Sequence, residues 1–193
     1  MVGVAGSVRV GGAVMVTDLF VAAEYRGRGL GGRVAAAVVN EASRRCTFSS
    51  SDPAALRVYA SLGMLPRWQL LTMRGPGAGL GSESLVAEWA HGRLDLVAHF
   101  ASIGAEVGAH HIALRGSVVQ LLRLESDAPH DVLAMLLSSV PMTDQLELSV
   151  CEHDELVAWL LARGFEVVDV DTFCATDGVD VSVGVPCVHR GLL

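Results

Sequence analysis

A glycine-rich segment that directly follows an apolar stretch constrains the fold of this chain most strongly. Residues 19–31 read LFVAAEYRGRGLG, and an alanine- and valine-rich stretch follows them. A strand that enters a glycine turn and then a helix directs free backbone N–H groups outward, and the helix dipole favours an anion there. Gly29 and Gly31 carry no Cβ, while Arg26 and Arg28 add positive charge. The segment therefore predicts a loop that binds phosphate groups.

Two common nucleotide-binding motifs do not fit this loop. Its pattern is Arg-x-x-Gly-x-Gly rather than GxGxxG, and no acidic residue follows at the ribose distance after a second strand. A Walker A loop requires a lysine, and the 14 residues counted as Lys+Arg are all arginine. An ordinary tight turn stays open as the alternative.

The composition excludes several classes of protein. Hydrophobic residues make up 51% of the 193 residues and charged residues 18%, so the chain can bury a core as one large or two small domains. The net charge of −7 argues against nucleic-acid binding. No apolar run reaches the roughly 20 residues of a membrane span, and the N-terminus lacks the basic region of a signal peptide. We expect a cytoplasmic protein without metal, whose four cysteines are reduced, with a disulfide or metal site as the alternative.

Hydrophobic periodicity and turn residues divide the chain into two halves. The first half is predicted to form strands at 2–10 and 13–21, a helix at 34–45, a strand at 46–50, a helix at 53–62 and a strand at 67–74. In the second helix, Asp52 suits the N-cap, Pro53 the first turn and Gly63 the end.

The second half follows the glycine-rich residues 75–81 and shows the same order of elements. The predicted elements are a helix at 84–102, strands at 111–115 and 118–124, a helix from 129 to before 141, a strand at 145–150, a helix at 154–163, and strands at 166–175 and 179–188. Residues 56–64 align with residues 157–165 on their glycines, which places Leu160 opposite Tyr59. This indicates an internal repeat.

Two motifs together resemble the coenzyme A site of the GNAT acyltransferase superfamily. The first is Leu19-x-Val21 followed by Arg26-x-x-Gly29-x-Gly31. The second is Asp52-x-x-Ala55-x-x-x-Tyr59-x-x-x-Gly63-Met64, where the family typically has Asn at the first position and Phe at the last. The resemblance implies an α/β (α+β) fold in which the strand before the loop splays from its neighbour at a bulge.

The resemblance also assigns roles to residues. The exposed backbone of the splayed strand would pair with the pantetheine arm of acetyl-CoA, and the loop amides would hold its pyrophosphate. The implied cofactor-binding residues are Phe20, Val21, Arg26, Gly27, Arg28, Gly29, Leu30, Gly31, Asp52 and Ala55.

The chemistry of the family requires a general acid and a general base. Amine attack on a thioester expels a thiolate, and the phenol of Tyr59 is the candidate that protonates the sulfur. Asp18 is the candidate base that accepts a proton from the amine, often through water, and Glu24 is a second candidate.

The chain departs from the complete family pattern in both halves. A complete domain has a strand, two helices and a further strand before the hairpin with which this sequence starts. The second half resembles the C-terminal repeat of tandem GNAT proteins, but its loop at 125–130 has two acids and no glycine, and Leu160 replaces the tyrosine. We therefore predict a partial GNAT domain with the acyl-CoA site at 1–75, a linker at 76–82 and a degenerate GNAT-like domain at 83–193.

The predicted function is N-acyl transfer, with acetyl moving from acetyl-CoA to a primary amine by direct attack in a ternary complex. The alternative is a non-catalytic acyl-CoA-binding or structural module. A third option is that the sequence begins late and the missing elements lie upstream. The expected partner is a small-molecule or peptide amine, with no nucleic acid or membrane, and an exposed sheet edge suggests a homodimer.

Overall fold

The computed structural model describes residues 1–10, 12–78, 106–107, 111–114, 118–124, 126–179 and 187–188. These residues form two compact units. Those within Met1–Leu70 and Val170–Val181 form unit 1, and those within Leu71–Asp169 and Ser182–Leu192 form unit 2. Strands β4 (Leu65–Pro76) and β9 (Glu166–Ala175) contribute residues to both units.

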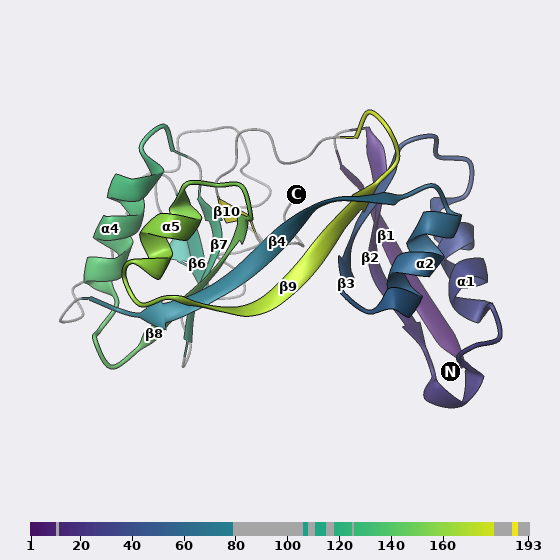
Figure 1. Ribbon diagram of the computed structural model, residues 1–193, viewed down its shortest axis with the longest axis horizontal. Coiled ribbons are helices and arrows are strands. Elements are labelled where there is room, and N and C mark those ends of the chain that lie inside the picture. Colours follow the sequence, from purple (N-terminus) through teal and green to yellow (C-terminus); the bar gives the residue numbers. More distant parts are fainter. Residues whose placement is uncertain are drawn as a thin grey trace. The chain divides into compact units, whose positions relative to one another are not determined.

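Unit 1 is a mixed sheet with two helices (Figure 1). Its strand order is β1-β2-β3-β9-β4, in which β2 and β3 are parallel while the pairs β1–β2 and β3–β9 are antiparallel. The elements not yet introduced are β1 (Gly3–Val10), β2 (Ala13–Val21), the 3-10 helix η1 (Ala23–Tyr25), α1 (Leu30–Val39), β3 (Arg45–Ser50) and α2 (Pro53–Ser61).

Helix α2 forms as the sequence predicts. The Asp52 carboxylate accepts a hydrogen bond from the Ala54 amide at 2.8 Å, and Pro53 occupies the first turn. Gly63, with a φ of +79°, ends the helix, so that the Met64 amide returns to the Tyr59 carbonyl at 3.0 Å.

Helix α1 differs from the predicted helix at 34–45. It begins four residues earlier, at Leu30, because Gly29 adopts the left-handed conformation (φ +73°) and Gly31 and Gly32 enter the first turn. It ends at Val39, since the chain must turn back before β3 begins at Arg45. The predicted helix is therefore displaced toward the glycine loop.

The two faces of the unit 1 sheet carry separate cores. Alternate residues of β2 point to opposite faces, so Val14 and Val16 join Val39, Tyr59 and Met64 on the face that the helices cover. The opposite core is formed by Ala13, Met15, Cys46, Phe173, Ala175 and Val179, with Phe48 and Trp68 packed against it.

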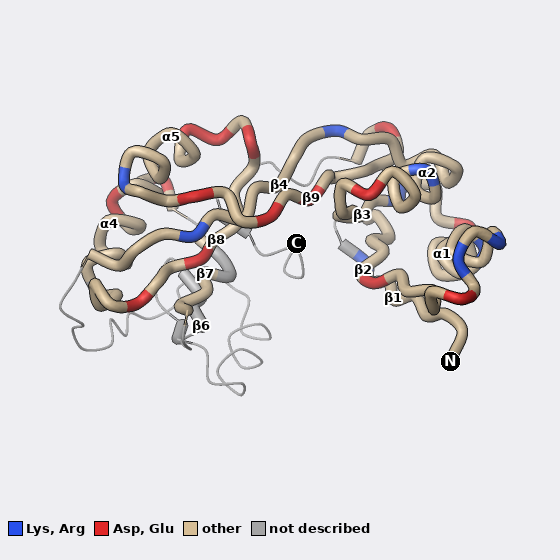
Figure 2. Tube along the Cα trace, turned by 60° about the horizontal axis from the view of Figure 1, so that its bottom comes forward, with Lys and Arg blue, Asp and Glu red and all other residues tan. Residues whose placement is uncertain are grey.

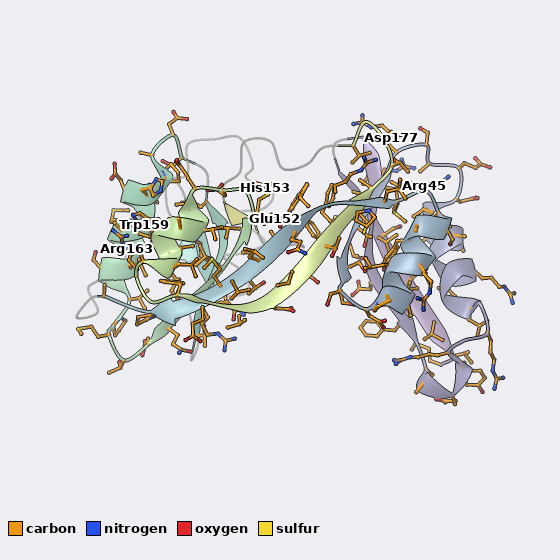
Figure 3. The ribbon with its side chains drawn as sticks, viewed as in Figure 1. Arg45, Glu152, His153, Trp159, Arg163 and Asp177 are labelled. Atoms are coloured by element: carbon orange, nitrogen blue, oxygen red, sulfur yellow. The ribbon has the colours of Figure 1, made fainter. Side chains whose placement is uncertain are left out.

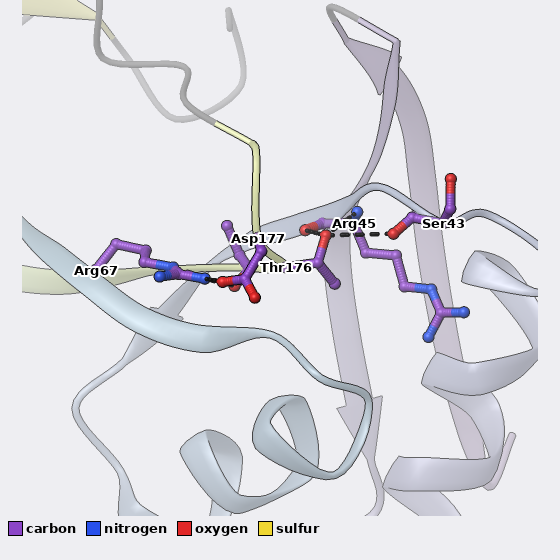
Figure 4. Close-up of polar contacts among 6 residues, drawn as sticks. Ser43, Arg45, Arg67, Thr176 and Asp177 are labelled. Carbon is purple, nitrogen blue, oxygen red and sulfur yellow. Dashed lines mark hydrogen bonds and ion pairs between the residues drawn. The ribbon is translucent and has the colours of Figure 1, made fainter.

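The C-terminal part of β9 completes unit 1. It pairs with β3 from Cys46↔Ala175 to Ser50↔Asp171. Beyond the strand, the Thr176 hydroxyl accepts from the Arg45 amide at 3.0 Å, and Arg67 forms a 2.6 Å ion pair with Asp177 (Figure 4).

This pairing changes the predicted division of the chain. Residues within Val170–Val181 belong with the N-terminal residues, whereas the sequence predicts a single domain over 83–193. The physical reason is that β3 has an open edge, which a strand from the far end of the chain fills. The start of the predicted linker is also ordered, since Pro76 ends β4 and the Gly77 amide donates to the Asp144 carbonyl at 3.0 Å.

Unit 2 is also a mixed sheet, with the strand order β9-β4-β8-β10-β7-β6-β5. Its further elements are β5 (Glu106–Val107), β6 (His111–Leu114), β7 (Val118–Leu124), α4 (Pro129–Ser139), β8 (Gln145–Cys151), α5 (Leu156–Leu161) and β10 (Cys187–Val188). Its core gathers apolar side chains of α4 and α5 against Met73, Val119, Leu121, Leu146 and Leu148. The fold is therefore of the predicted mixed α/β class.

Helix α5 is shorter than the predicted 154–163. It begins after Asp154, whose carboxylate accepts from the Leu156 amide at 2.9 Å, and Gly164 (φ +82°) follows it. Arg163 folds back over the Trp159 ring, with its guanidinium carbon 3.6 Å from the ring centroid (Figure 3). The predicted helix at 84–102 and residues 79–82 of the predicted linker lie outside the described residues.

Candidate functional site

The loop that precedes α1 presents free amides at a helix start. Gly27 and Gly29 have φ values of +75° and +73°, which residues with a Cβ rarely adopt. The first helical hydrogen bond runs from the Arg33 amide to the Gly29 carbonyl, so the amides of Leu30, Gly31 and Gly32 precede it and point out of the helix end. The first turn contains no acidic residue. These features suit an anion.

The arginines of the loop add positive charge, and basic positions appear blue beside α1 in Figure 2. Arg26, Arg28 and Arg33 are all exposed. The Arg26 side chain donates to the Val21 carbonyl at 2.9 Å, which ties the loop to the end of β2. The Arg28 guanidinium lies 5.6 Å from the centroid of the Tyr25 ring. The predicted loop residues are thus brought together at one end of unit 1.

Strands β2 and β3 part in front of this loop. Their parallel pairing covers three residue pairs and ends at Val16↔Thr47. The register between β1 and β2 shifts between Gly6 and Ser7, which places Thr17 at an irregularity immediately after that last pair. Residues 18–21 of β2 pair with β1 on their other side, and residues 48–50 of β3 pair with β9. Among the described residues, the two strands therefore leave an open fork between them.

Tyr59 lies at the base of the fork. Its side chain is 6% exposed and packs against Val14 and Val16 of β2. Burial raises the pKa of Tyr59; a hydrogen bond with the Thr47 side chain opposes this effect, and nearby Cys174 and Asp18 add to the rise. The phenol is therefore protonated at neutral pH, as a general acid must be before it acts.

Thr47 is a site residue that sequence reasoning missed. It is 1% exposed, and its hydroxyl donates to the Val16 carbonyl at 3.0 Å, in the last residue pair before the fork. Its side chain is also hydrogen-bonded with the Tyr59 side chain, and this bond lowers the pKa of Tyr59 against the effect of burial. A threonine in a strand carries no local motif, so only its position beside Val16 and Tyr59 reveals this role.

The two candidate bases both precede the loop in sequence. Asp18 is exposed on β2, just beyond the fork base, and its charge is felt at Tyr59. A Cβ added to Gly6 would lie 3.2 Å from its carboxylate, so the Asp18 side chain lies over the β1 backbone. Glu24 lies in η1 and is exposed. The structure brings Asp18, and not Glu24, into the electrostatic surroundings of Tyr59.

The other predicted contacts take different positions around the fork. Phe20 is 64% exposed near the end of β2. A Cβ on Gly31 would lie 3.7 Å from Val58 and 3.8 Å from Val21, so the loop, β2 and α2 meet at this point. Ala55 packs against the helix-covered core, and the Asp52 carboxylate caps α2. Asp52 therefore has a structural task whether or not it contacts a ligand.

We also searched the part of the chain that the structure describes for reactive cysteines, metal sites and membrane-spanning helices. Burial raises the pKa of the Cys46 and Cys174 thiols to about 11, so both are uncharged at neutral pH and unreactive. Cys46 and Cys174 are free thiols. No group of three or more His, Cys, Asp and Glu side chains that could hold a metal ion occurs among the described residues. Within the same residues, no helix has the length and apolar character needed to cross a membrane.

Comparison with known proteins agrees with this geometry. Residues 1–64 match the model of the Acetyltransferase (GNAT) family. A putative acetyltransferase from Pyrococcus horikoshii superimposes with a TM-score of 0.73 at 11% identity, covering 100% of this chain and 76% of that chain. The fold is that of GNAT acetyltransferases.

Two further solved structures share the GNAT fold. A GCN5-related N-acetyltransferase from Sphaerobacter thermophilus has a TM-score of 0.57 at 15% identity, covering 92% of this chain and 78% of that chain. A putative acetyltransferase from Thermoplasma acidophilum has a TM-score of 0.54 at 17% identity, covering 90% and 73% respectively. No curated protein matches the sequence. The family match therefore covers the candidate loop and Tyr59, and the structural likeness extends the GNAT fold over the chain.

Proposed function

We propose that the protein is an acyl-CoA-dependent N-acyltransferase that moves an acetyl group from acetyl-CoA to a primary amine. The observation that carries this proposal is the convergence of the glycine loop, the open fork and Tyr59 at one end of unit 1. The alternative of an ordinary tight turn does not explain why the loop lies beside two parted strands with a buried phenol at the point where they part.

The residues of the fork fit an acyl-CoA molecule. The amides of Leu30, Gly31 and Gly32 and the exposed loop arginines would hold the pyrophosphate. The free backbone edge of residues 18–21 would pair with the amide groups of the pantetheine arm. Positive φ and open space at Gly27 and Gly29 leave room for phosphate oxygens close to the backbone.

The chemistry follows from direct attack. The amine nitrogen bonds to the thioester carbon, the carbon–sulfur bond breaks, and the amine gives up a proton. Tyr59 transfers its hydroxyl proton to the departing sulfur, and Asp18 accepts the amine proton through water. Positioning of the two substrates in one ternary complex supplies much of the rate.

The two units are proposed to be repeats of one ancestral GNAT domain. Along the sequence, the order of two strands, a helix, a strand, a helix and a strand occurs twice, from β1 to β4 and from β6 to β9. Their second helices end alike: Gly63 and Gly164 both have positive φ, and the following amides of Met64 and Phe165 return to Tyr59 and Leu160. The acyl-CoA site would belong to unit 1 alone.

Calorimetric titration with acetyl-CoA tests the cofactor site. We expect micromolar binding by the unmodified chain and its loss in Gly29→Asp, because the new carboxylate would repel the pyrophosphate. Gly178→Asp is the matched control: that glycine also lies in unit 1, has a φ of +74° and has nothing within 4 Å of an added Cβ. Equal loss in both variants, or no binding by the folded chain, would contradict the proposal.

Turnover with a panel of primary amines tests the reaction. Tyr59→Phe should lower kcat by about 10²- to 10⁴-fold while leaving the Kd for acetyl-CoA unchanged, since only the proton donor is lost. Tyr25→Phe makes the same chemical change at the loop and should leave kcat unaltered. Acetyl-CoA binding without turnover on any amine would favour the non-catalytic acyl-CoA-binding module instead.

A further inference from the structure

Unit 2 contains a second parted pair of parallel strands. Strands β7 and β8 pair directly from Val118↔Gln145 to Leu121↔Leu148. Beyond this point β10 lies between them: Cys187 pairs with Leu124 of β7 and with Val150 of β8, both in antiparallel fashion. Figure 1 shows β10 beside β7. The second fork is therefore filled by the chain itself.

Among the residues that the structure describes, the corresponding place in unit 1 is open. Strands β2 and β3 pair directly over three residue pairs and then part, and in the described part of the chain no strand lies between them. In both forks a helix lies between the two strands in sequence, α1 in unit 1 and α4 in unit 2. In unit 2, β10 thus takes the position that the pantetheine arm would take in unit 1 under the proposed function.

The loop that follows β7 is also unsuited to a pyrophosphate. Helix α4 begins with Pro129, which has no amide to offer, and its first turn carries Asp131. Asp127 precedes the helix, and residues 125–130 contain no glycine. The charge at this helix start repels phosphate, independently of the strand that fills the fork.

We infer that the fork of unit 2 is a slot for the chain's own C-terminal strand β10, so that each chain binds one acyl-CoA and binds it in unit 1. The backbone groups that β7 and β8 leave free when they part are satisfied by β10 rather than by a ligand. The part of this inference that concerns the number of ligands rests on the proposed function, whereas the seating of β10 does not.

Hydrogen exchange measured by mass spectrometry tests the seating of β10. Cys187→Pro removes a backbone donor from β10, and Cys187→Ser keeps it as the matched control. We expect amides within 118–124 and 145–151 to exchange at least about tenfold faster in the proline variant, with residues 13–21 and 45–50 unchanged. Equal exchange in the folded proline variant and the unmodified chain overturns the inference.

If the proline variant does not fold, backbone proton contacts in NMR spectra of the unmodified chain decide. Contacts from Cys187 to Leu124 and Val150 support the seating of β10 between β7 and β8, and their absence overturns it.

The stoichiometry of acetyl-CoA binding tests the second part. One molecule per chain, with no residual binding in Gly29→Asp, is the expected result. Two molecules per chain, or binding that survives Gly29→Asp, overturns the inference that the second fork is closed. Absence of all binding contradicts the proposed function, and hydrogen exchange then still decides whether β10 fills the slot.

Discussion

The side chain of Thr47 links the backbone of the fork to the proposed acid. Its hydroxyl donates to the Val16 carbonyl, its side chain is hydrogen-bonded with that of Tyr59, and both side chains are buried. The hydrogen bond with Thr47 restricts the orientation of the buried Tyr59 hydroxyl. We therefore propose that Thr47 is a positioning residue that orients Tyr59.

Thr47→Val tests this role, because valine has nearly the same shape and no hydroxyl. We expect kcat to fall about tenfold, the equivalent of one modest hydrogen bond, with the KM for acetyl-CoA unchanged. In the Tyr59→Phe background the same substitution should have little further effect on kcat, because the phenol it positions is gone. Additive losses in the double variant would show that Thr47 acts independently of Tyr59.

At the scale of elements, α2 depends on the cap supplied by Asp52. The carboxylate accepts from the Ala54 amide at 2.8 Å at the start of the helix that carries Tyr59. The family pattern has Asn at this position, and Asn caps helices as well as Asp does. The departure from the pattern therefore preserves the helix start.

Urea unfolding of two variants separates capping from ligand contact. Asp52→Ala should lower the free energy of unfolding by about 1 kcal/mol, and Asp52→Asn should change it by only a few tenths. If Asp52 also contacts acetyl-CoA, Asp52→Asn will change the Kd at unchanged stability. Equal stability of the alanine variant and the unmodified chain would show that the cap contributes nothing.

At the scale of the whole molecule, unit 1 is completed by residues from the far end of the chain. Phe173 of β9 is fully buried, and its ring lies 4.8 Å from that of Trp68 and 5.2 Å from that of Phe48, measured between centroids. The Arg67–Asp177 ion pair is nearby but its carboxylate is 97% exposed, so it contributes little. The aromatic cluster, and not the ion pair, holds β9 in unit 1.

Phe173→Ala tests this dependence. The loss should be about 3–5 kcal/mol, since a buried aromatic ring is removed from a close-packed cluster. Val167→Ala, on an exposed position of the same strand, should cost far less. Hydrogen exchange should accelerate in residues 13–16 and 45–50 of unit 1 in the Phe173 variant. Acceleration confined to unit 2 would mean that β9 supports its own half of the sequence instead.

Helix α2 and the glycine loop could be predicted from the sequence because contacts between residues close together in the chain determine them. Asp52, Pro53 and Gly63 define α2 through contacts within a few residues. The glycine loop was recognised for the same reason, since positive φ at Gly27 and Gly29 and free amides at a helix start are properties of a short segment. The bounds of α1 and α5 differ from the prediction; α1 begins earlier because glycines that disfavour a helix interior here form its first turn.

The tertiary structure alone decided which distant segments meet. The pairing of β9 with β3, the hydroxyl of Thr47 beneath Tyr59 and the seat of β10 between β7 and β8 all join residues far apart in sequence. Such pairings depend on which strand edges remain open after local folding, and no spacing along the chain records that. The sequence by itself predicted a glycine loop and a candidate acid, while the tertiary structure determined that they share one fork and that the second fork is filled.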